Sequence, residues 1–208
     1  MDGVARGDDG VLRCWWGDAT AQYRYYHDRE WGVPVDDDVL LFEMLSLEGF
    51  QSGLSWLTIL RKRDAFRHSF ANFAFDQVAR FGQGDIERLL ANAGIVRHRG
   101  KIEAVVNNAR RAVELVREEG SLASYVWRYE PAPRRRRLDR TALRLLARPA
   151  EADALARDLK RRGWRFVGPT TVYAFMQAVG LVNDHLDGCE AGLASERARA
   201  SFRRPPGT

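Results

Sequence analysis

The two cysteines of the chain each have a histidine near them, and this pairing is the first pattern that could do chemistry. Cys14 is followed after twelve residues by His27, and His185 is followed after three residues by Cys189. Two thiolates and two imidazoles form a tetrahedral ligand set that suits zinc. Taken singly, each residue is more often a buried cysteine or a surface histidine. The mirrored pairs favour a metal that joins the two ends of the chain.

Four protein ligands would leave no open position on such a metal. An open position is what a zinc ion needs in order to activate water. The spacing therefore predicts one structural zinc per chain, held by Cys14, His27, His185 and Cys189.

Aromatic side chains are dense after Cys14, and one acid stands among apolar residues close to them. The aromatic residues are Trp15, Trp16, Tyr23, Tyr25, Tyr26, Trp31 and Trp56. The acid is Glu48, and Gly49 and Gly53 beside it let the backbone turn and approach a ligand closely. Burial would favour the neutral form of this carboxyl unless a cation pairs with it. The set could form a base-sized pocket, and a core of stacked aromatics with an ion-paired or capping glutamate is the alternative.

Basic residues concentrate in the second half of the chain. Between Arg128 and Arg165 there are 13 Lys and Arg against 5 Asp and Glu, whereas the whole chain carries a net charge of only +5. The remainder of the chain is therefore net acidic. A concentrated basic segment could face phosphate groups. An arginine-rich helix face in contact with water is the other explanation.

The elements that must position these residues are helices. The chain has 208 residues, enough for one domain or two small lobes with a core. Its 45% hydrophobic and 29% charged residues exclude wholesale disorder, and two cysteines are too few for a disulfide-stapled secreted protein. It has no apolar run of about 18 residues, and its N-terminus does not resemble a signal peptide. We expect a cytoplasmic monomer without a membrane span.

Apolar residues recur at helical spacing along most of the chain, and no long alternation predicts strands. The sequence predicts helices after residues 36–38, over 54–66, from an N-cap at Asp85 to a stop at Gly94, over 102–120, over 121–127, over 149–162 and over 169–180. We expect eight to ten short helices, with 129–140 as the best internal loop. Residues 1–11 and 190–208 are expected to be flexible tails around one helical domain over 12–189.

Several strings, in the same order along the chain, carry a resemblance to a known family. They are RC (13–14), YHDREWGVP (26–34), LFEM (41–44), LEG (47–49), GLSW (53–56), AGIVRHRGKI (93–102), FVGPT (166–170) and GLVNDH (180–185). Together they resemble the DNA-3-methyladenine glycosylase I family of bacteria. The resemblance runs from about Arg13 to about Cys189, which is nearly the whole chain.

This resemblance implies an all-α helix-hairpin-helix glycosylase fold, with two lobes around a base pocket and a structural zinc that joins the N- and C-terminal segments. The zinc ligands of the family carry over to the same four residues that the spacing indicates. Its base-contacting carboxylate carries over to Glu48. Its aromatic pocket carries over to Tyr26 and Trp56, and also to Trp16 and Tyr23.

The resemblance also places a DNA-binding hairpin over residues 162–170. The residues expected at the DNA backbone are Arg162, Gly163, Arg165, Gly168 and Thr170. Amide groups at a turn and a helix start can hold a phosphate, and the arginines add positive charge.

Two positions depart from other hairpin glycosylases, and the family shares the second departure. Phe166 stands where a hairpin glycine is usual, and Asn183 stands where a catalytic aspartate is usual. Asp184 follows one place later. The resemblance therefore argues against Asp184 as the catalyst.

The activity that the resemblance implies is hydrolysis of the N-glycosidic bond of 3-methyladenine in double-stranded DNA, after the base is flipped out. This lesion is cationic, so aromatic faces and an ionised Glu48 would favour it over adenine. One alternative is a non-enzymatic helical DNA-binding module whose zinc only fastens the chain ends. Another is a zinc hydrolase, which would need an open coordination position.

Overall fold

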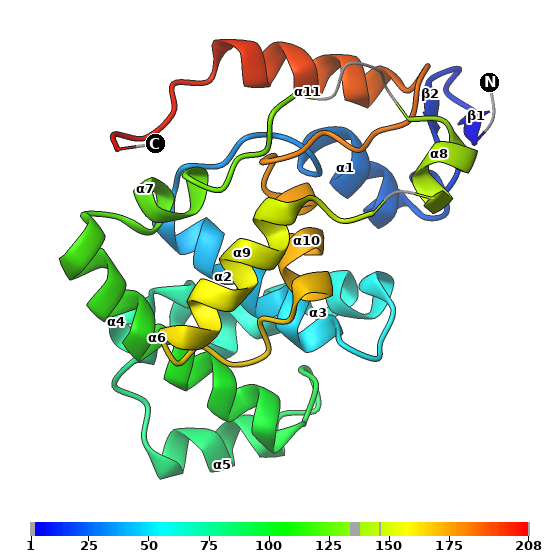
Figure 1. Cartoon of the computed structure of the whole chain (residues 1–208). Helices are drawn as coiled ribbons and strands as arrows, with labels where there is room; N and C mark the ends of the chain where they lie inside the picture. The colour runs from blue at the N-terminus through cyan, green and yellow to red at the C-terminus, as the bar shows by residue number, and fades with distance from the viewer. Residues whose placement is uncertain (1–2, 134–137, 146, 208) are drawn as a thin grey trace.

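The computed structural model describes residues 3–133, 138–145 and 147–207. Within these ranges it contains eleven α-helices, one 3-10 turn and one small antiparallel sheet, which confirms the all-α prediction (Figure 1). The elements are β1 (Val4–Arg6), β2 (Leu12–Cys14), α1 (Ala21–Arg29), α2 (Asp38–Gln51), α3 (Trp56–Ser69), η1 (Ala71–Phe73), α4 (Phe75–Val78), α5 (Gln83–Ala91), α6 (Arg99–Glu119), α7 (Leu122–Trp127), α8 (Arg140–Leu145), α9 (Ala150–Arg161), α10 (Pro169–Ala178) and α11 (Glu190–Ser201).

Helix α2 lies at the centre of the fold, and other helices surround it. It packs against α3, α6, α7 and α10, and α10 in turn packs against α9. Every residue from Leu41 to Phe50 is buried, because the sequence there is apolar on all sides of the helix. Two acids, Glu43 and Glu48, are carried into the interior by this helix. Arg67 Nε pairs with Glu43 Oε1 at 2.9 Å, so Glu48 is the acid left for another role.

Several predicted helix boundaries are confirmed by their capping contacts. The Asp37 side chain accepts a hydrogen bond from Leu40 N at 2.8 Å, and the Ser121 hydroxyl accepts one from Ser124 N at 2.8 Å. Gly120 ends α6 with a φ of 85°, in the left-handed region where glycine is favoured. Asp85 is not the N-cap of its helix, because α5 begins at Gln83 and Asp85 accepts a hydrogen bond back from Gly82 N at 3.1 Å.

The two ends of the chain, expected to be flexible tails, form secondary structure instead. Strand β1 pairs with β2, and α11 packs against α1 and β2 (Figure 1). Beyond α11, Arg204 Nη2 donates to Glu130 Oε1 at 2.8 Å, and within α11 Arg199 Nη2 donates to the same oxygen at 2.6 Å. Glu130 belongs to the predicted internal loop. Ion pairs between segments this far apart cannot be read from composition.

Two parts of the predicted loop are described: residues 129–133 contain no helix, and of residues 138–140 the last, Arg140, begins α8. Residues 134–137, which hold the densest run of arginines, lie outside the described residues. No helix among the described residues is long and apolar enough to cross a membrane.

Candidate functional site

The structure brings the four predicted metal ligands together in one buried cluster. Their ligand atoms all lie within 4.8 Å of one another. Cys189 Sγ lies 3.5 Å from His27 Nε2 and 3.5 Å from His185 Nδ1, and Cys14 Sγ lies 3.8 Å from His185 Nδ1. Cys14 ends β2, His27 is in α1, and Cys189 caps α11. The cluster therefore ties the N-terminal segment to the C-terminal one.

Surrounding contacts fix which ring nitrogens face the cluster. His27 Nδ1 lies 2.7 Å from Asp28 Oδ1, and His185 Nε2 lies 3.0 Å from the carbonyl oxygen of Trp31. These acceptors turn the other nitrogen of each ring toward the sulfurs. Metal-binding histidines are commonly oriented in this way, by a carboxylate or a carbonyl on the far side of the ring.

The charges of the cluster also fit a cation. A hydrogen bond between the two sulfurs raises the pKa of Cys14 and lowers the pKa of Cys189. Burial opposes ionisation of Asp28, but hydrogen bonds from Arg13 and His27 hold its pKa below the ordinary value. A bound dication would allow both sulfurs to be thiolates. The residues present fit a structural metal ion.

The predicted base-pocket residues line one cavity of about 300 Å³. Its walls come from α1, α2, α3, α10 and the segments around α1, and they comprise Trp16, Tyr23, Tyr26, Trp31, Glu48, Gln51, Trp56, Ala174 and Gln177. Gln51 is one helical turn after Glu48, so helical spacing could have indicated it. Ala174 and Gln177 come from α10, and the packing of α10 on α2 rather than any sequence pattern brings them here.

Glu48 is the acidic residue among those that line this cavity. Only 5% of the residue is exposed. Burial raises its pKa to about 8, so at neutral pH the carboxyl is largely protonated until a cation or a set of donors meets it. Burial and the neighbouring Glu48 charge also raise the pKa of Tyr26, so this phenol stays neutral.

Two pairs of rings form the aromatic walls. The Tyr26 and Trp56 ring centroids are 5.3 Å apart with the planes tilted by 51°, and the Trp16 and Tyr23 centroids are 5.8 Å apart in an edge arrangement. Within the described residues, the buried Trp56 Nε1 has no hydrogen-bond partner. A buried donor without a partner is costly, which suits a site completed by a ligand.

The metal cluster and the cavity share a wall. The Trp31 ring lies 4.5 Å from the His185 ring, and the Trp16 ring lies 5.0 Å from the His27 ring, as centroid distances. Both tryptophans also line the cavity. The residues that would hold a metal therefore also support two of the rings that would contact a base.

The predicted hairpin connects α9 to α10. Gly163, with a φ of 82°, follows the end of α9, and Gly168 caps α10 with Pro169 as its first residue. The following amide groups, beginning with Thr170, belong to a first helical turn whose N–H groups lack partners within the helix. Phe166, the residue in place of a glycine, has a φ of 56°. The backbone thus keeps a conformation that glycine would favour.

The two hairpin arginines differ in their surroundings. Arg162 donates to Glu118 Oε2 at 2.6 Å and Glu119 Oε1 at 2.7 Å on α6, and to Asp158 Oδ2 at 3.0 Å. It therefore fastens the end of α9 to α6. Arg165 is exposed.

Asn108 of α6, which the sequence did not indicate, holds the hairpin in place. Its Oδ1 accepts from Arg165 N at 2.8 Å, and its Nδ2 donates to Arg165 O at 2.9 Å. On the other side, a Cβ added to Gly49 would lie 3.5 Å from the Phe166 Cβ. The hairpin therefore packs directly on the residue that follows Glu48.

The two residues at the usual catalytic position are both used inside the protein. Asn183 Nδ2 donates to Gly192 O at 2.9 Å, which fastens the loop before α11. Asp184 is 1% exposed and accepts from Gln177 Nε2 at 2.8 Å and from the Tyr173 hydroxyl. Asp184 is not among the residues that line the cavity, but it contacts Gln177, which is.

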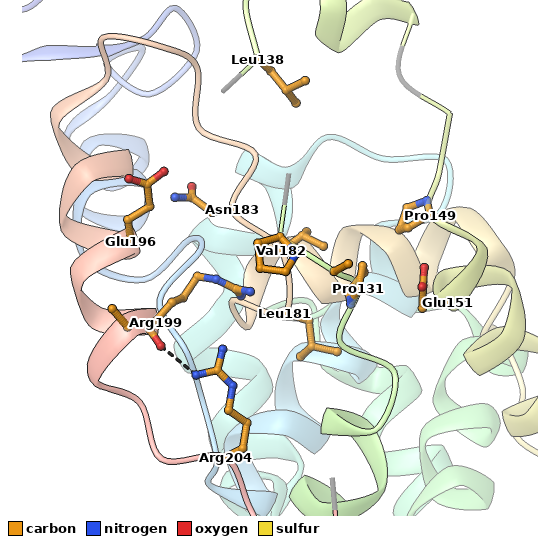
Figure 2. A pocket seen from close by; sticks show the side chains of 13 residues that line it. Pro131, Leu138, Pro149, Glu151, Leu181, Val182, Asn183, Glu196, Arg199 and Arg204 are labelled. Atoms are coloured by element: carbon orange, nitrogen blue, oxygen red, sulfur yellow. Dashed lines mark hydrogen bonds between the residues drawn. The ribbon is translucent and has the colours of Figure 1, made fainter. Parts of the chain in front are cut away.

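A second and larger cavity, of about 640 Å³, lies between α11, the loop after α10 and the proline-rich loop (Figure 2). Leu181 and Val182 form part of its wall, and Arg204 Nη1 donates to Arg199 O at 2.9 Å across one side. None of the residues predicted for the functional site is among those that line it.

Comparison with known proteins places this geometry among DNA repair enzymes. Residues 15–192 match the methyladenine glycosylase family. DNA-3-methyladenine glycosylase 1 of Escherichia coli (strain K12) is 44% identical over 177 residues, covering 85% of this chain and 95% of that protein.

Solved structures show the same similarity. A crystal structure of a 3-methyladenine DNA glycosylase I matches with a TM-score of 0.80 and 45% identity, covering 86% of this chain and 98% of that one. A second structure, of the Staphylococcus aureus 3-methyladenine DNA glycosylase I, addresses 3-methyladenine recognition. It matches with a TM-score of 0.80 and 37% identity, covering 86% of this chain and 96% of that one.

Proposed function

The chain belongs to the methyladenine glycosylase family, and from this premise we propose that it is a DNA-3-methyladenine glycosylase I. It hydrolyses the N-glycosidic bond of 3-methyladenine in DNA. The observation that carries this proposal is Glu48, a buried acid that lines an aromatic cavity between α1, α2, α3 and α10.

The first step is extrusion of the base from the duplex, because the bond to be cleaved is not reachable inside the stack. The flipped ring enters the cavity and packs against Tyr26 and Trp56, with Trp16 and Tyr23 completing the aromatic wall. A cationic ring is attracted to aromatic faces more than a neutral one. The Glu48 carboxyl loses its proton as it accepts hydrogen bonds from the lesion, so the cavity favours the methylated base over adenine.

In the chemical step the bond between the sugar C1′ and the base nitrogen breaks, and its electron pair goes to the base. The methylated base thereby loses its positive charge and leaves without protonation by the enzyme. Water adds to C1′ and releases a proton. Positioning of the sugar and electrostatic stabilisation of its oxocarbenium-like transition state supply the catalysis.

We further propose that the metal is one zinc ion, bound by Cys14, His27, His185 and Cys189. Thiolate and imidazole ligands support zinc over the oxygen-preferring cations. With four protein ligands it is structural: it joins the ends of the chain and supports Trp16 and Trp31.

The hairpin is proposed to bind the DNA backbone. The amide groups near Gly168 and Thr170 and the exposed Arg165 would hold a phosphate, and Gly163 permits the turn. Arg162 contributes through its ion pairs with α6, which support the turn from behind. We also propose that the enzyme acts as a monomer in the cytoplasm.

The test is incubation with DNA that has been treated with a methylating agent, followed by chromatography of the released bases. We expect release of 3-methyladenine by the wild type and a much lower rate with Glu48→Gln. A DNA-binding module without activity would bind this DNA in a salt-dependent manner but release no base. A catalytic zinc would be indicated if chelation abolished base release while the protein stayed folded.

A further inference from the structure

We propose that Gln177 is a specificity-determining residue that selects alkylated adenine over alkylated guanine, and that Asp184 is the positioning residue that sets its orientation. This inference rests on the proposed function, since it concerns which base the cavity accepts. It starts from a hydrogen-bond network between side chains of α10 and of the loop that follows it.

Gln177 lies at the boundary between the cavity and this network. With Ala174, one turn earlier on α10, it lines the cavity that contains Glu48. Its Nε2 donates to Asp184 Oδ2 at 2.8 Å, and the Tyr173 hydroxyl donates to the same oxygen. The side chain is therefore held at one end while it faces the cavity.

The Asp184 carboxylate also determines the orientation of the Gln177 amide group. A carboxylate can only accept hydrogen bonds, so the nitrogen of the Gln177 amide must be the atom that faces Asp184. Asp184 is 1% exposed, so water does not compete with this arrangement. The carbonyl oxygen, Oε1, is then the polar atom of Gln177 left to meet a bound base. Without this partner the amide could turn over and offer its NH2 group instead.

The cavity thus presents two hydrogen-bond acceptors, the ionised Glu48 carboxylate and Gln177 Oε1. Adenine carries an exocyclic amino group, which donates two hydrogen bonds, whereas guanine carries a carbonyl oxygen at the equivalent position. An amino group can satisfy both acceptors. A guanine oxygen would face Gln177 Oε1 without a proton between, which is unfavourable.

The test measures release of 3-methyladenine and of 3-methylguanine from the same methylated DNA, in single-turnover reactions with excess enzyme at pH 8. Gln177→Met keeps the length of the side chain and removes both polar atoms. We expect it to slow 3-methyladenine release by about tenfold while 3-methylguanine release is unchanged or faster. Asp184→Asn lets the Gln177 amide turn over. It should therefore also lower the ratio of the 3-methyladenine rate to the 3-methylguanine rate.

Gln83→Met is the matched control, because Gln83 Nε2 also donates to a carboxylate, Glu87 Oε1 at 2.9 Å, but on the exposed face of α5. Its ratio of the two rates should equal that of the wild type. Zinc content and Tm are measured for all variants, because Asp184 precedes the cluster residue His185 and a loss of fold in Asp184→Asn would show in both. In that case Gln177→Met decides alone.

Three outcomes separate the explanations. An unchanged ratio with folded Gln177→Met overturns the inference and leaves the proposed function standing. An equal fall in both rates also overturns it, because it assigns Gln177 a purely structural role. If the wild type releases neither base, it is the proposed function that fails.

Discussion

Because the pKa of Glu48 is raised, we predict that the free energy of unfolding falls as the pH rises. In Glu48→Gln this fall should be absent. Burial shifts this pKa from 4.5 to about 8. Below pH 4.5 the carboxyl is protonated in both the folded and the unfolded chain, and it contributes no difference. Between pH 4.5 and 8 only the folded state keeps the proton, so the free energy of unfolding falls as the pH rises. Above pH 8 the loss is complete, at about 5 kcal/mol as an upper estimate.

Glutamine has nearly the same shape as glutamate but does not titrate, so the free energy of unfolding of Glu48→Gln should not fall in this way. Relative to the wild type, Glu48→Gln should gain about 3 kcal/mol of stability between pH 5.5 and pH 8.5. The assay is urea unfolding of the zinc-loaded proteins across this range, with Glu87→Gln on the exposed face of α5 as the control for the substitution itself.

A stability difference between Glu48→Gln and the wild type that stays constant from pH 5.5 to 8.5 would refute this reasoning. It would mean that Glu48 is already ionised in the folded protein at pH 5.5. The same variant should lose base release by on the order of 1–3 kcal/mol in activation free energy, the scale of a charge-assisted hydrogen bond. Stability and activity should therefore change in opposite directions.

Three further predictions follow from the site. Cys14→Ala should bind no zinc and lose about 4 kcal/mol or more of stability, measured by elemental analysis and urea unfolding; a full zinc content would contradict the ligand assignment. Arg165→Glu should weaken binding to damaged and undamaged duplexes alike and flatten the salt dependence of binding. Arg162→Glu should chiefly lower the free energy of unfolding, by about 1–3 kcal/mol. Fluorescence anisotropy measures the first effect and urea unfolding the second, and a loss of lesion preference alone in Arg165→Glu would exclude a phosphate contact. Trp56→Ala should slow single-turnover release by roughly 1–3 kcal/mol with zinc content intact, and wild-type rates would exclude stacking on Trp56.

The metal cluster and the acid of the cavity could be predicted because each has a local signature. Cys14 and His27, and His185 and Cys189, are unusual residue types that stand in pairs. Glu48 is conspicuous as an acid inside an apolar helix. In both cases the residue types already restrict the chemistry. The structure adds that the four Cys and His side chains lie together, and that Glu48 lies beside the aromatic residues.

Gln177 and Asn108 could not be predicted in this way. Each is an amide in an ordinary amphipathic helix, and its role depends on what a distant segment places beside it. The same holds for the chain ends, where Glu130 meets Arg199 and Arg204. Arginines and prolines at the end of a chain are typical of a mobile segment, and the sequence does not show that a distant glutamate pairs with them.

The contact between the hairpin and Gly49 has a consequence for how DNA is searched. The hairpin proposed to bind a phosphate packs on the residue next to Glu48, so the distance between the proposed phosphate site and Glu48 is set by direct packing. If both roles hold, one nucleotide would have to place its base at Glu48 while its phosphate lies on the hairpin. Gly49→Val would push the hairpin away from Glu48. We expect this variant to bind DNA and to bind the free base, but not to hold the phosphate and the base of one nucleotide at the same time.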